Sequence, residues 1–528
     1  MPRILARPSR FVSRRAAGRI DARWCPEQRF LTPRTGPDFV QNQTVTIAQG
    51  CLEGQVQELR EGNGVASFLG IPYAAPPVGE RRWRAPCPAP SWEGVRRADT
   101  WGDVCPQNIF PPNILPEMPV GMSEDCLTLN VWKPAEAGAD AGLPVMVWIH
   151  GGGYVSGGSA NPAYSGHAFA RDGVVLVSIN YRIARFGFFV HPALADEGFG
   201  GNFGFLDQIT ALEWVRDNIA AFGGDPARVT VFGESAGGGS VHMLLQSPRA
   251  RGLFAGAIVQ SGGGRDTMLP ASSKAKAAAT GEAFAPGASA QDLRAMPEAD
   301  IVGDLGMTKM ISDSYCGPVL DGETQIGEPL AAARNGLYPD VPVLIGANSA
   351  DGFPSGEDKD ALFARFGEAE AQARRLYDPE GDKSALEIGT QMSADHLFRE
   401  PARALARTLA ARGQHVWLYR FAHVGVTSGL AMGGVPHAAE IPYVFDVPEA
   451  RLQQIDTGYD AAVAALTHRY WVNFAKTGRP DGVGDVPAWP RVTGESDTCV
   501  QLIESTGARH AEDPLTATLD FRERQLQG

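Results

Sequence analysis

The sequence predicts an α/β protein built around a large, mostly parallel sheet, and three observations support this. Short apolar runs recur along the chain ahead of segments with helical periodicity. The 528-residue chain is long enough to bury about three quarters of its surface. Its composition, 44% hydrophobic and 20% charged, is that of a globular protein rather than a disordered or fibrous one. No apolar run approaches the roughly 18 residues of a membrane span.

Four apolar runs predict strands: residues 143–149, 174–179, 229–232 and 341–345. Between the second and third runs, apolar residues recur every three or four positions from Leu206 to Phe222, which predicts a helix packed on the sheet. Residues 265–415 are rich in Ala and Arg, and we expect a helical excursion there, part of which caps a site. No long linker follows residue 40, so residues 41–528 are predicted to form a single domain.

Charge is distributed unevenly along the chain. Residues 1–37 contain nine Arg against two acidic residues, a balance of +7, so the rest carries −20 of the formal net charge of −13. Such an acidic body repels nucleic acid and anionic membranes, which favours a small-molecule partner. Residues 1–40 are predicted to be a disordered extension, with an organelle-type presequence or a mis-assigned start codon as alternatives. They lack the apolar core of a secretory signal, which slightly favours the cytoplasm. The oligomeric state stays open.

No metal or cofactor is predicted. The seven Cys are too few for a disulfide scaffold in a chain of this length, and none forms a CxxC pair. The zinc motif HExxH and the phosphate loop GxxxxGK[ST] are also absent from the sequence.

The predicted chemistry centres on residues 222–237, where an apolar strand run ends in Gly-Glu-Ser-Ala-Gly. A serine at a sharp strand-to-helix turn needs glycines two positions before and after it, because side chains there would clash. We therefore predict Ser235 as a nucleophile. The pentapeptide alone would also fit a Gly-rich structural turn, but the preceding strand and the partners below favour the nucleophile.

A second motif, Trp148-Ile-His-Gly-Gly-Gly-Tyr154, closes the first apolar run. Acyl transfer develops negative charge on a carbonyl oxygen, and backbone amides freed by consecutive glycines can point at it. We expect Gly152, Gly153 and Ala236 to be these donors. A phosphate cradle is a rival interpretation, although neither GxGxxG nor a following Lys is present, and a flexible turn is another.

A serine nucleophile needs a base, and in the α/β-hydrolase order an acid and then a histidine follow it. His437 lies in a loop after the strand-like residues 415–421 and is the best placed. Three other histidines lie in predicted helical or tail segments: His396, His468 and His510. Asp351 follows the fourth strand, where α/β sites gather their groups. Asp-Gly is usually a turn, so this assignment stays open, and Glu440 is the alternative orienting acid.

With these motifs, the chain resembles the type-B carboxylesterase family, which also contains cholinesterases and related lipases. Residues 222–237 match the family's serine segment completely, and residues 124–131 resemble its second signature. Further similar segments are residues 68–79, 201–208 and 317–322. The resemblance covers residue 41 to the C-terminus and leaves residues 1–40 outside.

The resemblance implies an α/β-hydrolase fold with helical cap excursions and a triad of Ser235, His437 and Asp351. It also implies oxyanion glycines at 152 and 153. Residues in supporting roles would be Glu234, Glu440 and Ser261. The sequence departs from the family twice: Asp351 replaces the usual Glu and is one methylene shorter, and Ala438 replaces the usual Gly after the histidine.

Two further implications concern the segment from Cys105 to Cys126. These cysteines resemble the family's loop-closing disulfide pair, although reduced cysteines fit equally well in the cytoplasm. The loop has no aromatic residue from Asn113 to Cys126, where cholinesterases place a cation-binding Trp. Choline esters are therefore disfavoured.

The sequence thus predicts a cofactor-free serine carboxylesterase that acts on uncharged or weakly charged esters through an acyl-enzyme. One alternative is a hydrolase of amides, carbamates or thioesters on the same triad, because the acyl-enzyme chemistry is shared. The other is a binding module that keeps the fold without catalysis, as some family members do. Such members usually lose the serine, which is present here.

Overall fold

The computed structural model describes residues 41–527, except 59–63, 110–117, 198–199, 266, 268, 311, 316 and 451–456. Val40–Gly528 form one compact unit. The extension predicted over residues 1–40 lies outside the described residues.

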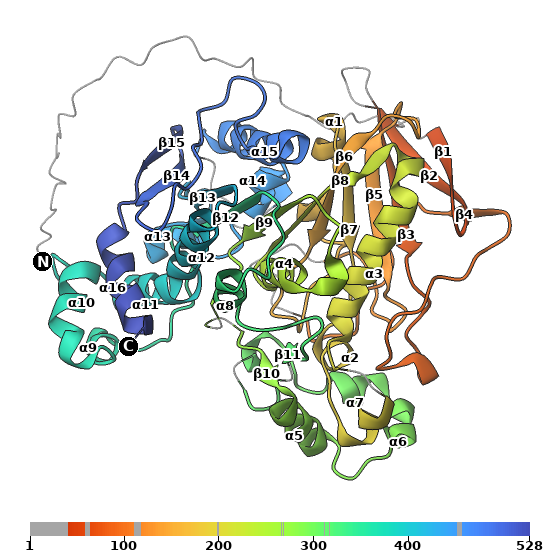
Figure 1. Cartoon of the computed structure of the whole chain (residues 1–528), viewed down its shortest axis with the longest axis horizontal. Helices are drawn as coiled ribbons and strands as arrows, with labels where there is room; N and C mark the ends of the chain where they lie inside the picture. The colour runs from red at the N-terminus through yellow and green to blue at the C-terminus, as the bar shows by residue number, and fades with distance from the viewer. Residues whose placement is uncertain are drawn as a thin grey trace, which may run out of the picture. The chain divides into compact units, whose positions relative to one another are not determined.

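Within the described residues, a 13-stranded sheet forms the centre of this unit (Figure 1). Its strands are β1 (Gln41–Ile47), β2 (Gly50–Glu58), β3 (Gly64–Pro72), β4 (Val95–Arg97), β5 (Thr128–Pro134), β6 (Leu143–Ile149), β7 (Val175–Ile179), β8 (Gly224–Glu234), β9 (Gly256–Gln260), β12 (Val343–Asn348), β13 (Val416–Phe421), β14 (Cys499–Glu504) and β15 (Gly507–Glu512). The order across the sheet is β1-β2-β3-β5-β7-β6-β8-β9-β12-β13-β14-β15, and β4 pairs with β2. A separate parallel pair joins β10 (Ser272–Ser273) to β11 (Val319–Leu320).

The centre of the sheet, from β7 to β14, is entirely parallel. Its strands are apolar on both faces: in β6, Val145 and Val147 join one hydrophobic core, whereas Met146 and Trp148 join the other. A parallel strand covered on both faces gives a continuous apolar run in the sequence. The four predicted strands are β6, β7, β8 and β12, so the α/β prediction is confirmed.

Along the main strand order both edges of the sheet pair antiparallel, whereas β4 pairs parallel with β2, so the sheet is mixed. The N-terminal edge escaped the sequence analysis. In β1 only Val45 and Ile47 are buried, and Thr46 between them is exposed. A half-exposed antiparallel strand leaves alternation rather than an apolar run.

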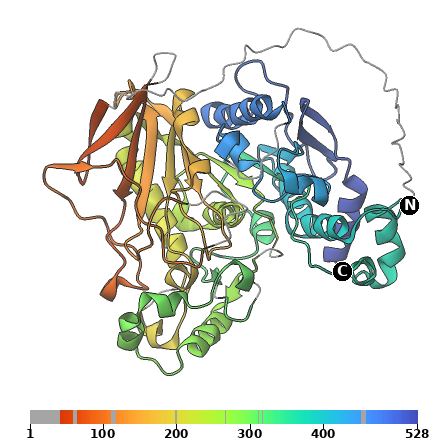
Figure 2. The same ribbon diagram turned by 180° about the vertical axis from the view of Figure 1, so that it is seen from behind.

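Helices cover both faces of the sheet (Figures 1 and 2). Their bounds are α1 (His167–Arg171), α2 (Ala184–Gly187), α3 (Phe203–Asn218), α4 (Ala236–Gln246), α5 (Lys274–Phe284), α6 (Ala290–Ala295), α7 (Glu298–Val302), α8 (Pro329–Arg334), α9 (Lys359–Ala364), α10 (Glu370–Tyr377), α11 (Ala385–Ala394), α12 (Glu400–Ala411), α13 (Thr427–Met432), α14 (Ile441–Val444), α15 (Asp460–Thr477) and α16 (Thr516–Gln527). Helices α3, α4, α8 and α12 contribute to the first core, and α1, α14 and α15 to the second. The predicted helix ending at Phe222 is α3 with the following 3₁₀ turn Ile219–Phe222.

The predicted excursion over residues 265–415 is not continuous. Strand β12 lies within it as a central strand, and α8 and α12 pack into the first core. What remains forms two separate helical groups, α5 to α7 and α9 to α11, the latter packed with α16 (Figure 1). Across the described ranges, no helix has the length and apolar character that a membrane span requires.

Candidate active site

Ser235 occupies the turn between β8 and α4, with φ at 57°. Positive φ is rare for a residue with a side chain and marks a strained turn. The flanking glycines are required by space: a Cβ on Gly237 would lie 2.1 Å from the Ile149 carbonyl oxygen, and one on Gly233 would lie 2.6 Å from the Gly237 carbonyl carbon. The local geometry is therefore that of the strained strand-to-helix turn that the sequence predicts.

His437 and Asp351 lie together at the carboxyl ends of the parallel strands. His437 Nδ1 donates to Asp351 Oδ1 at 2.6 Å. Asp351 is fully buried, and its Oδ2 accepts from Ser261 Oγ at 2.6 Å and from the Asn348 amide at 2.8 Å. Both carboxylate oxygens are thus held, and the shorter acid reaches the histidine. Ala438, the second departure from the family, has φ at 61°, a conformation that glycine adopts more easily.

The other nitrogen of the His437 imidazole faces Glu234. His437 Nε2 lies 3.2 Å from Glu234 Oε1, and Glu234 directly precedes Ser235. Burial would lower the pKa of His437, but the carboxylates of Glu234 and Asp351 outweigh it and raise the pKa to about 9. The two carboxylates therefore favour the imidazolium over the neutral ring.

Glu440, the alternative orienting acid, is engaged elsewhere. Its Oε1 accepts from Gln260 Nε2 at 3.0 Å, and its Oε2 accepts from Asn348 Nδ2 at 2.6 Å. Burial and the charge of Asp351 raise the pKa of Glu440. The structure thus brings Asp351 to the imidazole. Glu440 instead holds the side chain of Asn348, whose backbone N–H donates to Asp351.

The glycine loop after β6 lies against Ser235, since a Cβ on Gly151 would come within 3.1 Å of the Ser235 Cβ. Gly152 and Gly153 have φ of 106° and 61°, which favours glycine at both positions. Within the described part of the chain, the amides of Gly152, Gly153 and Ala236 donate no hydrogen bond. These amides are therefore available to an oxyanion.

Several residues around the site left no signal in the sequence. Phe398 and Phe353 pack against the His437 ring, and Tyr315 donates to the Gly153 carbonyl at 3.1 Å. Their partners lie far away in the chain, so no local spacing could have indicated them. The three other histidines that the sequence analysis weighed do not meet Asp351: His396 lies in the π-helical turn after α11, His468 in α15 and His510 in β15.

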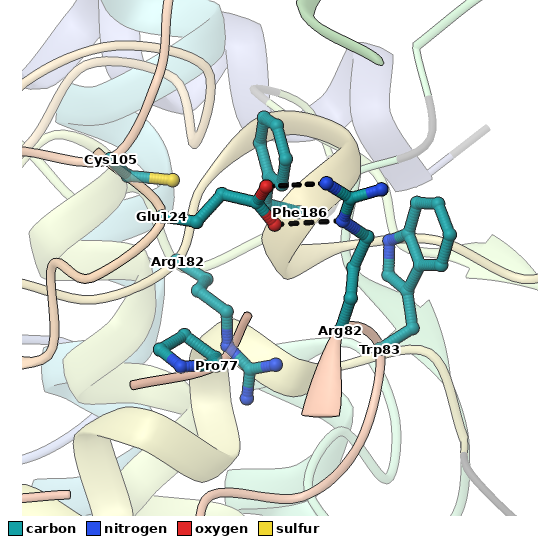
Figure 3. Close-up of a pocket in the computed structure, with 7 residues that line it drawn as sticks. All are labelled: Pro77, Arg82, Trp83, Cys105, Glu124, Arg182 and Phe186. Atoms are coloured by element: carbon teal, nitrogen blue, oxygen red, sulfur yellow. Dashed lines mark hydrogen bonds and ion pairs between the residues drawn. The ribbon is translucent and has the colours of Figure 1, made fainter. Parts of the chain in front are cut away.

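Cys105, one member of the predicted cysteine pair, lines a small pocket (Figure 3). Cys105 and Cys126 are both buried and are free thiols in the structure. The neighbouring thiol of Cys105, together with burial, raises the pKa of Cys126. The pocket is bordered by the ion pair of Arg82 with Glu124, and none of the predicted triad residues lines it. Among the described residues, no group of three or more His, Cys, Asp or Glu side chains could hold a metal ion.

Comparison with known proteins shows the family to which the chain belongs. A model described as the carboxylesterase family matches residues 41–521. Fumonisin B1 esterase from Sphingopyxis macrogoltabida is 36% identical over 84% of this chain and 83% of its own length. Para-nitrobenzyl esterase from Bacillus subtilis is 37% identical, covering 85% and 92% respectively. Acetylcholinesterase from Bungarus fasciatus is 33% identical, covering 87% and 82%. The chain therefore belongs to the carboxylesterase family and is a carboxylic ester hydrolase with an α/β-hydrolase fold.

Proposed function

We propose that the chain hydrolyses carboxylic esters through an acyl-enzyme on Ser235, with His437 as general base and acid and Asp351 as the orienting acid. The observation that carries this proposal is the 2.6 Å hydrogen bond from His437 Nδ1 to a fully buried Asp351. This bond fixes the tautomer, so that the other nitrogen is the one that exchanges protons. That nitrogen faces the residue preceding Ser235.

In the first half-reaction, Ser235 Oγ attacks the ester carbonyl carbon while His437 Nε2 takes the hydroxyl proton. The carbonyl oxygen becomes an oxyanion, which the amides of Gly152, Gly153 and Ala236 stabilise. The intermediate then expels the alcohol, which receives the proton from His437. In the second half-reaction, water attacks the acyl-enzyme with the same proton transfers and releases the carboxylic acid.

We propose small uncharged or weakly charged esters as the substrate class. Relatives with similar chains bear names as different as fumonisin B1 esterase and acetylcholinesterase, so family membership does not select the ester. Choline esters remain disfavoured because residues 113–126 contain no aromatic side chain for a quaternary ammonium group. The same triad would also accept amides, carbamates or thioesters, and a binding role without turnover is the remaining alternative.

A substrate panel tests this proposal. Wild-type protein and Ser235→Ala are assayed on p-nitrophenyl esters of increasing acyl length, on a matching anilide and carbamate, and on a thioester. We expect the wild type to turn over esters with the highest kcat/KM and Ser235→Ala to lose nearly all turnover. A carbamate, anilide or thioester preferred over every ester would reassign the substrate, and no turnover of any compound would favour the binding role.

A further inference from the structure

The imidazole of His437 packs against two phenylalanine rings, to which the mechanism proposed above assigns no role. Phe398 stacks on it, with ring centroids 4.9 Å apart and planes inclined by 24°. Phe353 meets it at 5.0 Å and a steep 69°. Phe398 is fully buried, whereas Phe353 is 44% exposed. One face of the imidazole is therefore covered by a ring that cannot move into solvent.

The in-plane contacts of the two ring nitrogens with Asp351 and Glu234 do not by themselves fix the plane of the imidazole. Asp351 holds Nδ1 and the side chain is anchored at Cβ, so the ring can still rock about the line through these two points. Rocking carries Nε2 toward or away from Ser235, and proton transfer requires the two heavy atoms to lie within about 2.6–3.2 Å. A flat ring stacked on the imidazole restricts this motion, because tilting would force the two rings together.

Phe398 reaches this position from an irregular turn of helix. Residues Asp395–Arg399 form a π-helical turn between α11 and α12. Such a turn holds one more residue than an α-helical turn and changes the direction of the side chains on it. Two buried charged groups brace it: Arg399 Nε lies 2.7 Å from Asp395 Oδ1, and Asp395 Oδ2 accepts from Tyr377 at 2.9 Å.

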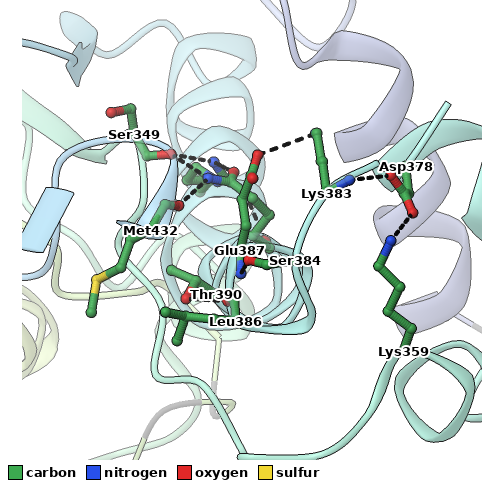
Figure 4. Close-up of polar contacts among 11 residues, drawn as sticks. Ser349, Lys359, Asp378, Lys383, Ser384, Leu386, Glu387, Thr390 and Met432 are labelled. Carbon is green, nitrogen blue, oxygen red and sulfur yellow. Dashed lines mark hydrogen bonds and ion pairs between the residues drawn. The ribbon is translucent and has the colours of Figure 1, made fainter. Parts of the chain in front are cut away.

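Hydrogen bonds connect the same region to the loop that contains Asp351 and to the segment that leads to His437. Arg399 Nη1 donates at 2.8 Å to the carbonyl of Ser349, two residues before Asp351. Gln391, on α11, donates to the same carbonyl at 3.3 Å and to the Met432 carbonyl at 3.5 Å (Figure 4). Hydrogen bonds thus join α11 and the π-helical turn to the loop that contains Asp351 and to the segment that leads to His437.

We propose that Phe398 is a positioning residue, whose ring, set in place by the π-helical turn, holds the plane of the His437 imidazole so that Nε2 faces Ser235. This inference rests on the function proposed above. The face of an aromatic ring carries partial negative charge and attracts cations. The same contact therefore favours the imidazolium that forms when His437 accepts the serine proton.

Three variants test this role. Phe398→Leu removes the flat ring, Phe398→Tyr keeps it, and Phe363→Leu makes the same change at another fully buried phenylalanine, on α9. For Phe398→Leu we expect kcat to fall roughly ten- to a hundredfold while KM changes little. The rising limb of its pH profile should also move to lower pH, because the imidazolium loses a favourable contact. Phe398→Tyr and Phe363→Leu should keep the wild-type profile.

The proposal is overturned if Phe398→Leu matches Phe363→Leu in kcat and pH profile, whatever their melting temperatures. If Phe398→Leu does not fold, Phe398→Met replaces it, because an unbranched thioether fills irregular space without a ring face. Failure of the underlying function would look different: the wild type itself would hydrolyse no ester and form no organophosphate adduct at Ser235.

Discussion

At the scale of single residues, Asp351 holds His437 Nδ1 although its side chain is one methylene shorter than the glutamate usual in the family. Its second oxygen is bound by Ser261 and by the Asn348 amide, so the carboxylate has one orientation. Because Asp351 is fully buried, a longer side chain would have to fit among buried neighbours. Replacement of Asp351 by Asn or by Glu should therefore reduce activity.

Asp351→Asn should lower kcat by about 10,000-fold and leave KM nearly unchanged, because an amide can donate to Nδ1 and select the wrong tautomer. Asp351→Glu should retain partial activity, above that of the Asn variant. Steady-state kinetics on one p-nitrophenyl ester measures both, with Glu440→Gln as the matched variant. The assignment is wrong if Asp351→Asn keeps more than about a tenth of wild-type kcat while Glu440→Gln abolishes it.

The pH dependence follows from His437. Only the neutral imidazole accepts the serine proton, and its pKa is raised to about 9 by Glu234 and Asp351 against the effect of burial. Below that pH, kcat/KM should therefore rise roughly tenfold per pH unit and then level off. Glu234→Gln removes a charge that stabilises the imidazolium, so the rising limb of its kcat/KM profile should lie at lower pH than that of wild type. The control variant Glu93→Gln changes an exposed carboxylate and should keep the wild-type pH profile. A rising limb that lies at the same pH in Glu234→Gln as in wild type contradicts this account.

At the scale of elements, the turn between β8 and α4 depends on close backbone packing that only glycine permits. The Cα of Gly237 lies so near β6 that a Cβ would meet the Ile149 carbonyl oxygen at 2.1 Å. Neither clashing residue can shift freely, because Gly237 lies in the first turn of α4 and Ile149 is the last residue of the central strand β6. Neither element can move without disturbing the sheet.

Gly237→Ala should therefore destabilise the fold by about 3 kcal/mol or more and reduce turnover of the protein that still folds. Thermal melting and kcat measure the two effects. Gly327→Ala is the control, since a Cβ there meets nothing within 4 Å and its φ is not positive. Equal melting temperatures for the two variants would show that the turn tolerates a side chain.

The elements differ in how far the sequence could predict them. Strands β6, β7 and β8 are buried on both faces, so each leaves an apolar run, and the turn at Ser235 leaves its glycines. The π-helical turn at Asp395–Arg399 leaves no such mark, because its residues would also suit an α-helix. The contact of Phe398 with His437 depends on that turn and on two loops meeting in space, which no local pattern encodes.

At the scale of the whole molecule, the compact unit and the family match begin together. The unit starts at Val40, the match at residue 41, and β1 at Gln41, where it pairs with β2. We propose that residues 41–528 form a single catalytic domain and that residues 1–40 are an extension outside it. Residues 1–40, which include Asp38, then carry a formal balance of +6, and residues 41–528 carry one of −19.

A chain that starts at residue 41 should keep the melting temperature and the kcat/KM of the full chain, because removal of a segment outside the core costs little stability. The two proteins are compared under identical buffer conditions. Aggregation of the shortened chain, or a large loss of kcat/KM, would place residues 1–40 within the functional unit.

The account rests on one atom, the Oγ of Ser235, and the most direct test is intact-mass analysis after treatment with an organophosphate, followed by peptide mapping. Organophosphates phosphorylate the activated serine of an acyl-enzyme hydrolase, so wild-type protein should gain one adduct, on the peptide that contains Ser235, as esterase activity disappears. Ser235→Ala should fold as the wild type does, gain no adduct and show almost no turnover. Full activity in Ser235→Ala, or an adduct at another residue, would contradict the account.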